Sequence, residues 1–118
     1  MFFKKRKYVV GNKKVLCDRI QSVEDFLKLK ISSIIVNYEH SNGCSRIAYI
    51  GGDIKVRGFN NSVSFSEMFS STEVYDQVVL DYRYVESIVE ESLIGKPNIL
   101  KIGVLGGLVY YIELQEED

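Results

Sequence analysis

The sequence predicts an α+β domain: a mainly antiparallel sheet of about seven to eight strands built from hairpins, with two or three short helices packed on it. Two features of the chain lead to this expectation. Pairs of turn-forming residues separate short runs of alternating apolar residues, and a few amphipathic segments with helix-capping residues interrupt those runs. With 118 residues, of which 46% are apolar and 26% are charged, the chain has the size and composition of a single domain, residues 1–118.

The N-terminal segment is expected to form a basic hairpin. Gly11-Asn12 separates residues 7–10 from residues 13–17 and is a favoured two-residue turn. Charged residues on both faces of this hairpin are typical of an edge ribbon, where lysines prevent unwanted strand pairing. The basic residues of the ribbon are Lys4, Lys5, Arg6, Lys7, Lys13 and Lys14.

The middle of the chain is expected to form a three-stranded meander from about Ser33 to Phe59. Its two turns are Asn42-Gly43 and Gly51-Gly52. Counting outward from either turn places the same apolar residues on one face of the meander. These residues are Ile34, Val36, Tyr38, Ile47, Tyr49, Ile54 and Val56. A later run, residues 74–84, alternates in the same way and predicts a strand with one buried face.

Three segments have helical signals. Ser22 and Asp25 form a variant of the capping box and predict a helix over residues 23–30. Ser64 and Glu67 match the same motif and predict a short helix through residue 69. An apolar stripe over residues 85–93, followed by Gly95 and Pro97, predicts the third.

The C-terminal segment, Ile99 to Leu114, predicts a hairpin about the turn Gly106-Gly107. Placing Leu105 opposite Leu108 makes both faces of this hairpin apolar. In a hairpin with one exposed face, apolar and polar residues alternate along each strand. A hairpin with two apolar faces must therefore be covered on both sides, and another chain is one way to cover the second face. The expected interface residues are Ile102, Val104, Val109, Tyr110 and Tyr111.

Residues that carry chemistry are scarce. His40 and Cys44 are spaced across the Asn42-Gly43 turn, but too few further ligands are near for zinc, and no orienting group is visible for a cysteine nucleophile. The glycines of residues 103–107 are followed by a strand, whereas a phosphate loop is followed by a helix. We therefore expect no catalytic residue, no metal site and no cofactor, and the chain is not expected to be an enzyme.

A small protein-binding module is the expected function, of the kind represented by inhibitors, immunity proteins and phage- or virus-type accessory proteins. We expect it to self-associate as a homodimer through its C-terminal hairpin. Two cysteines are too few for a disulfide framework, and no window approaches the roughly 18 apolar residues of a membrane span, so a cytoplasmic location without a membrane partner is expected.

Nucleic-acid binding through the basic ribbon is the alternative function. The cations of the ribbon are interleaved with Phe2, Phe3 and Tyr8, a combination that suits single strands. The net charge of −1 and the acidic end of the chain argue against this alternative.

Overall fold

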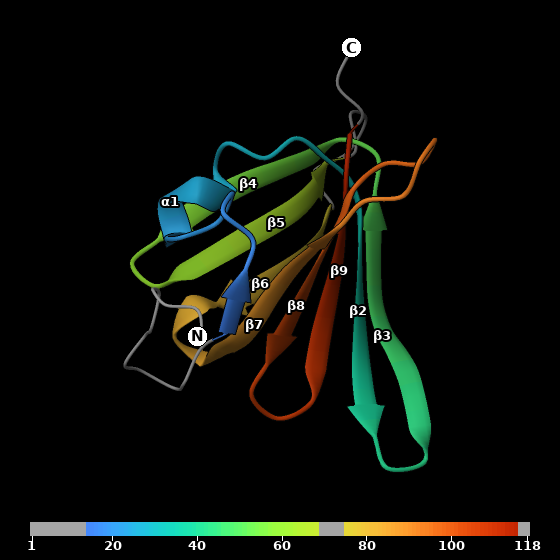
Figure 1. Ribbon diagram of the computed structural model, residues 1–118. Coiled ribbons are helices and arrows are strands. Elements are labelled where there is room, and N and C mark those ends of the chain that lie inside the picture. Colours follow the sequence, from blue (N-terminus) through green and yellow to red (C-terminus); the bar gives the residue numbers. More distant parts are fainter. Residues whose placement is uncertain (1–13, 69–74, 116–118) are drawn as a thin grey trace.

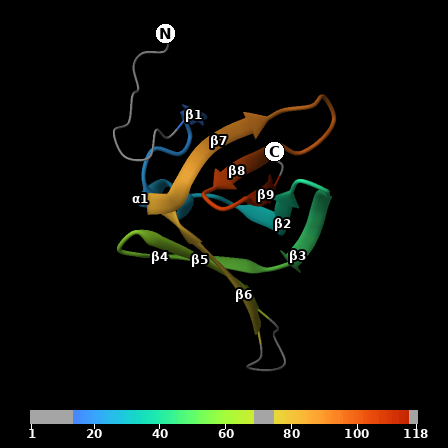
Figure 2. The same cartoon turned by 90° about the horizontal axis from the view of Figure 1, so that it is seen from below.

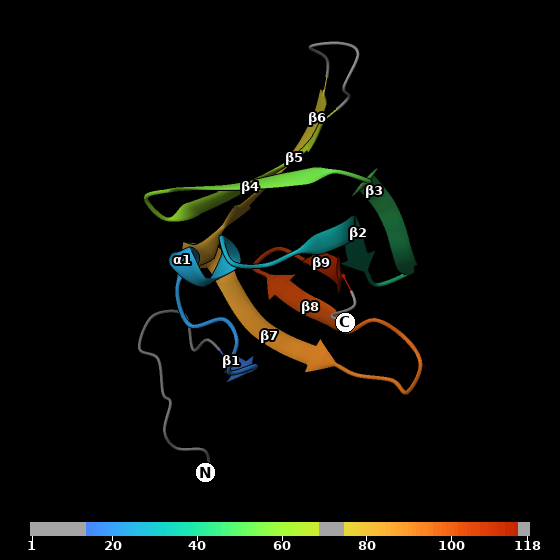
Figure 3. The same cartoon turned by 90° about the horizontal axis from the view of Figure 1, so that it is seen from above.

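Two β-sheets share one hydrophobic core in the computed structural model (Figure 1), which describes residues 14–68 and 75–115. The larger sheet has the order β1 (Lys14–Leu16), β7 (Val85–Glu91), β8 (Ile99–Val104), β9 (Leu108–Leu114), β2 (Ile31–His40) and β3 (Gly43–Gly51). The smaller sheet has the order β4 (Ile54–Phe59), β5 (Ser62–Met68) and β6 (Tyr75–Asp81). The larger sheet is curved, and the smaller sheet lies across one of its sides (Figures 2 and 3).

The mainly antiparallel architecture is confirmed. Strands β2 to β9 all pair antiparallel, and β1 joins the larger sheet by parallel pairing with β7. Fewer helices form than predicted. The described residues contain one short α-helix, α1 (Val23–Phe26), and one 3-10 turn, η2 (Tyr82–Tyr84).

Helix α1 begins where the capping pattern places it, but it ends after one turn instead of reaching residue 30. The Asp25 carboxylate reaches back and accepts a 2.7 Å hydrogen bond from the backbone N–H of Gln21. Phe26 is fully buried and packs edge-on against Phe65 and Tyr82. Beyond α1 the chain becomes rich in β-branched residues, which favours the strand β2 over a longer helix.

The helix predicted over residues 85–93 is wrong, because this segment is strand β7. A β-bulge shifts the register between Val85 and Ser87, so that Val85 and Ile88 both face the core. Side chains on one face of a regular strand recur every two residues. The extra residue of the bulge increases this spacing to three residues, which is also the spacing of side chains on one face of a helix. The helix predicted from Ser64 is also wrong. Val63 and Phe65 are buried two residues apart in strand β5, so regular alternation prevails over the capping motif.

The predicted meander forms only in part. Strands β2 and β3 make a hairpin, but His40 pairs with Gly43, whereas the turn Asn42-Gly43 predicts pairing with Ser45, two residues further along. At Gly51-Gly52 the chain does not turn back on itself; it leaves the larger sheet and enters the smaller one. Gly52 has φ +86°, a conformation that suits glycine at such a corner. The strand predicted over residues 74–84 forms in part: β6 covers Tyr75–Asp81, and Tyr82–Tyr84 form the 3-10 turn η2.

The C-terminal hairpin also differs from its predicted register by one residue. Val104 pairs with Leu108 and Lys101 with Tyr111, which leaves Leu105-Gly106-Gly107 as the loop. A shift of one residue exchanges the two faces of one strand relative to the other. The prediction of two wholly apolar faces is therefore wrong. The residues that face the core are Leu100, Ile102, Val104, Tyr110, Ile112 and Leu114, and those on the opposite face include Lys101, Gly103, Tyr111 and Glu113.

Candidate functional site

The five residues expected at an interface do not share one surface. Ile102, Val104 and Tyr110 are buried in the core between the two sheets. Val109 and Tyr111 lie on the face of the larger sheet that is turned away from β4, β5 and β6, here called the outer face. In the described part of the chain, no helix or strand covers the outer face (Figures 1 and 3).

A row of large side chains crosses the outer face. Tyr49 pairs with Ile35, Ile35 with Tyr111, and Tyr111 with Lys101. The ammonium of Lys101 lies 5.9 Å from the centre of the Tyr111 ring, and the Tyr111 hydroxyl donates a 3.1 Å hydrogen bond to Glu39. Burial and the Glu39 carboxylate raise the pKa of Tyr111. The row has apolar rings with polar ends, a composition that suits a protein interface.

Among the described strands, β3 is an edge of the larger sheet and lies beside this row. It is nine residues long, it pairs with β2 on one side, and it is the last strand in the order of the sheet. Ile47 and Tyr49 are 57% and 53% exposed. Since Val36 pairs with Ala48 and Asn37 with Arg46, Ile47 is the extra residue of a bulge. The predicted meander places β3 between β2 and β4, so the sequence pattern does not indicate that β3 is an edge strand.

His40 and Cys44 do not form a site. The His40 ring stacks on Tyr38 with centres 5.2 Å apart, and its Nε2 lies 3.3 Å from the Ser45 hydroxyl. Cys44 is exposed and pairs with Glu39 across the hairpin. Across residues 14–68 and 75–115, no three His, Cys, Asp or Glu side chains gather where they could hold a metal ion.

Cys17 is the second free thiol and lies in a different place. It is buried, and its sulfur lies 3.5 Å from a carboxylate oxygen of Glu90. Burial raises the pKa of the Cys17 thiol, and the Glu90 carboxylate raises it further. Such a thiol is a packing residue and a poor nucleophile at neutral pH.

Most of the basic ribbon lies outside the described residues. This holds for Lys4, Lys5, Arg6, Lys7 and Lys13, so the nucleic-acid alternative stays a prediction. Lys14 is the first residue of β1, which pairs with β7. Three further basic residues lie in the middle of the chain, and they are divided between the two sheets. Arg46 is on β3 in the larger sheet, and Lys55 and Arg57 are on β4 in the smaller sheet.

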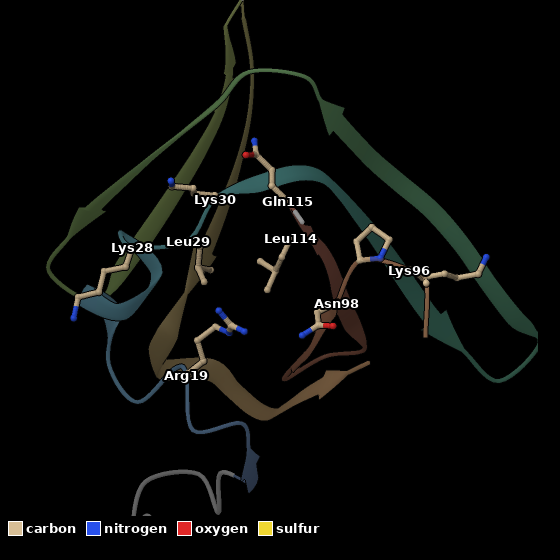
Figure 4. A pocket seen from close by; sticks show the side chains of 10 residues that line it. Arg19, Lys28, Leu29, Lys30, Lys96, Asn98, Leu114 and Gln115 are labelled. Atoms are coloured by element: carbon tan, nitrogen blue, oxygen red, sulfur yellow. The ribbon is translucent and has the colours of Figure 1, made fainter. Parts of the chain in front are cut away.

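A basic pocket opens elsewhere on the molecule, lined by residues that are far apart in the sequence (Figure 4). Four cationic side chains lie around it: Arg19, Lys28, Lys30 and Lys96. Sequence analysis did not find this pocket because no local motif unites its residues.

Comparison with known proteins adds no relative. No family model matches the chain, no curated protein matches it, and no solved structure matches it. Among the described helices, none has the length and apolar character needed to cross a membrane.

Proposed function

We propose that the protein is a non-catalytic protein-binding module that self-associates as a homodimer through strand β3 and the adjoining part of the outer face. One observation carries this proposal: β3 is a long edge strand with exposed apolar side chains and a single charged residue, Arg46. Tyr111, one of the five residues expected at an interface, lies partly exposed on the same outer face, whereas Val109 on that face is already buried within the chain.

An unpaired edge strand presents a row of backbone N–H and C=O groups that can pair with another strand. Proteins usually protect such edges with lysines, prolines, bulges or a very short strand. Of these devices, β3 has only the bulge at Ile47, and that bulge leaves the Ile47 side chain exposed to solvent. At the opposite edge, the described part of β1 has three residues.

A second copy of the chain is the partner that β3 suits best, because antiparallel pairing about a two-fold axis makes a strand complementary to itself. If the axis passes near Ile47, each Arg46 lies opposite Ala48 of the other copy, and the two Arg46 side chains are not placed opposite each other. The pairing would extend the larger sheet across both subunits. It would also bring the Tyr49, Ile35 and Tyr111 rows of the two copies into one continuous face.

The experiment compares matched lysine substitutions by multi-angle light scattering. Ile47→Lys places a charge on the edge, next to its symmetry mate in the dimer, and we expect it to weaken self-association by about tenfold or more, which is about 1.4 kcal/mol. Phe59→Lys is the control, since Phe59 is also an exposed apolar residue but lies at the far end of β4 in the smaller sheet. Equal effects of the two substitutions, or a monomeric unmodified chain, would refute the proposal.

A further inference from the structure

Four separate segments of the chain form the walls of the basic pocket (Figure 4). They are Arg19 after β1, residues 28–30 between α1 and β2, residues 95–98 between β7 and β8, and residues 114–115 at the end of β9. The cavity has a volume of about 710 Å³. Sites for small molecules commonly enclose roughly 300 to 1,000 Å³, so the pocket is large enough for such a ligand.

The lining of the pocket carries uncompensated positive charge. In the part of the chain that the structure describes, the lining includes four cations and no acidic residue. Arg19 is paired with Glu90 and Lys28 with Asp25. In the described residues no carboxylate forms an ion pair with Lys30 or Lys96. Among the described residues, these two ammonium groups thus have no carboxylate partner.

The floor of the pocket is held in place by Glu90. Its carboxylate accepts hydrogen bonds from Arg19 at 2.8 and 3.1 Å and from the side-chain amide of Asn98 at 2.7 Å. The Arg19 guanidinium holds the pKa of Glu90 below its ordinary value, so this network is ionised at neutral pH. Glu90 on β7 thus connects the wall that contains Arg19 to the wall that contains Asn98. Because these side chains are already held in place, less conformational entropy is lost when a ligand binds.

The opposite wall is fixed through the backbone. The N–H of Gln115 donates a 2.8 Å hydrogen bond to the carbonyl of Lys30, which ties the end of β9 to the segment before β2. Figure 4 shows the polar ends of Arg19 and Asn98 on either side of Leu114, with the lysines around the periphery. The pocket thus combines a fixed, partly apolar floor with long cationic side chains at its rim.

We propose that this pocket binds the phosphate group of a small organic molecule. A phosphate carries more than one negative charge and several acceptor oxygens, which suit the amide donors of Asn98 and Gln115. Lys30 and Lys96 lie on opposite sides of the pocket in Figure 4, and their long side chains must turn inward to contact the ligand. Leu29, Pro97 and Leu114 offer apolar surface to the organic part of the ligand. This inference does not depend on the proposed self-association.

The test is calorimetric titration of the full chain with inorganic pyrophosphate, and with succinate at equal ionic strength as a comparison anion. We expect saturable binding of pyrophosphate that is tighter than binding of succinate. Lys30→Gln and Lys96→Gln should each weaken it about fivefold or more, because each removes a charged donor. Lys55→Gln is the matched control, since Lys55 is an exposed lysine on β4, and it should change the affinity less than about twofold.

A second arm of the experiment addresses competition from within the chain. Glu116, Glu117 and Asp118 directly follow the pocket residue Gln115 in the sequence. The titrations are therefore repeated on a variant that combines Glu116→Gln, Glu117→Gln and Asp118→Asn. Pyrophosphate binding in either background that is sensitive to Lys30→Gln supports the proposal.

Two results would overturn the assignment. The first is the absence of saturable pyrophosphate binding in both backgrounds, or binding that Lys30→Gln and Lys96→Gln leave unchanged. The second is much tighter binding of a single-stranded 12-residue oligonucleotide that is lost in Lys30→Gln, which would assign the pocket to nucleic acid.

Discussion

The hydroxyl of Tyr110 on β9 donates a 2.7 Å hydrogen bond to the backbone carbonyl of Val79 on β6. The bond joins the larger sheet to the smaller one, and the Tyr110 ring itself is buried in the shared core. Burial raises the pKa of Tyr110, so the hydroxyl stays protonated and continues to donate at neutral pH. Tyr110 is thus a residue of the interior, although its neighbour Tyr111 lies on the outer face.

Replacing Tyr110 by Phe removes this bond and keeps the ring. We expect Tyr110→Phe to lower the free energy of unfolding by about 1 kcal/mol, measured by urea denaturation. Tyr111→Phe is the matched control, because its hydroxyl donates to the exposed side chain of Glu39. It should cost less than about 0.5 kcal/mol, and a larger loss for Tyr111→Phe than for Tyr110→Phe would contradict the assigned faces.

The stability of the protein should depend on the ionisation of Glu90. Its hydrogen bonds to Arg19 and Asn98 are made by the carboxylate, and the pKa of Glu90 is lowered from the ordinary value of 4.5. A carboxylate with a lowered pKa stabilises the fold above its pKa in the unfolded chain. That stabilisation is lost as the pH falls through the pKa in the folded protein.

Replacing Glu90 by Gln should therefore cost about 1 to 2 kcal/mol at neutral pH, and the difference from the unmodified protein should shrink as the pH falls below about 4.5. Chemical denaturation at a series of pH values measures both effects. Glu91→Gln is the control, since Glu91 is the exposed neighbour at the end of β7. A constant difference across the pH series would show that Glu90 acts without its charge.

The two thiols should differ in reactivity. Cys44 is exposed, whereas Cys17 is buried and burial raises its pKa. In the native protein, a disulfide reagent such as Ellman's reagent should modify Cys44 rapidly. It should modify Cys17 at least about 100-fold more slowly. Cys44→Ser should abolish the fast phase, and denaturant should expose Cys17. A fast phase that survives in Cys44→Ser would contradict the position of Cys17.

Substitutions in the C-terminal hairpin should separate core residues from surface residues. Ile102→Ala creates a cavity between the sheets, and we expect it to lower the free energy of unfolding by about 3 kcal/mol. Tyr111→Ala should cost much less stability but should weaken self-association, because Tyr111 lies on the outer face. Thermal unfolding and light scattering on both variants check this. If Ile102→Ala and Tyr111→Ala dissociated the dimer equally, this result would contradict the assignment of Ile102 to the core and Tyr111 to the outer face.

Regular alternation was the signal that predicted structure most reliably. Val78 and Leu80 repeat every two residues in β6 without a bulge, and that strand was predicted correctly. In β7, the bulge before Ser87 produces the spacing of a helix, so the sequence pattern indicated the wrong element. A sequence window cannot distinguish the two cases, because the hydrogen bonds that create a bulge come from a neighbouring strand.

Turn residues were less informative about topology. The pair Gly51-Gly52 suits a two-residue hairpin and a corner between sheets equally well, because both require positive φ. At Gly106-Gly107 the loop has one residue more than predicted, which exchanged the faces of the C-terminal hairpin. The same limitation applies to surfaces. The edge strand and the basic pocket both depend on which strands become neighbours, and local sequence does not determine that.

Sedimentation velocity of the unmodified chain, over a concentration series that reaches about 0.3 mM, tests the proposed self-association most directly. The account predicts a species with twice the 13.5 kDa mass of one chain, and a shift back to the single-chain mass in Ile47→Lys. A mass of 13.5 kDa at every concentration would contradict it.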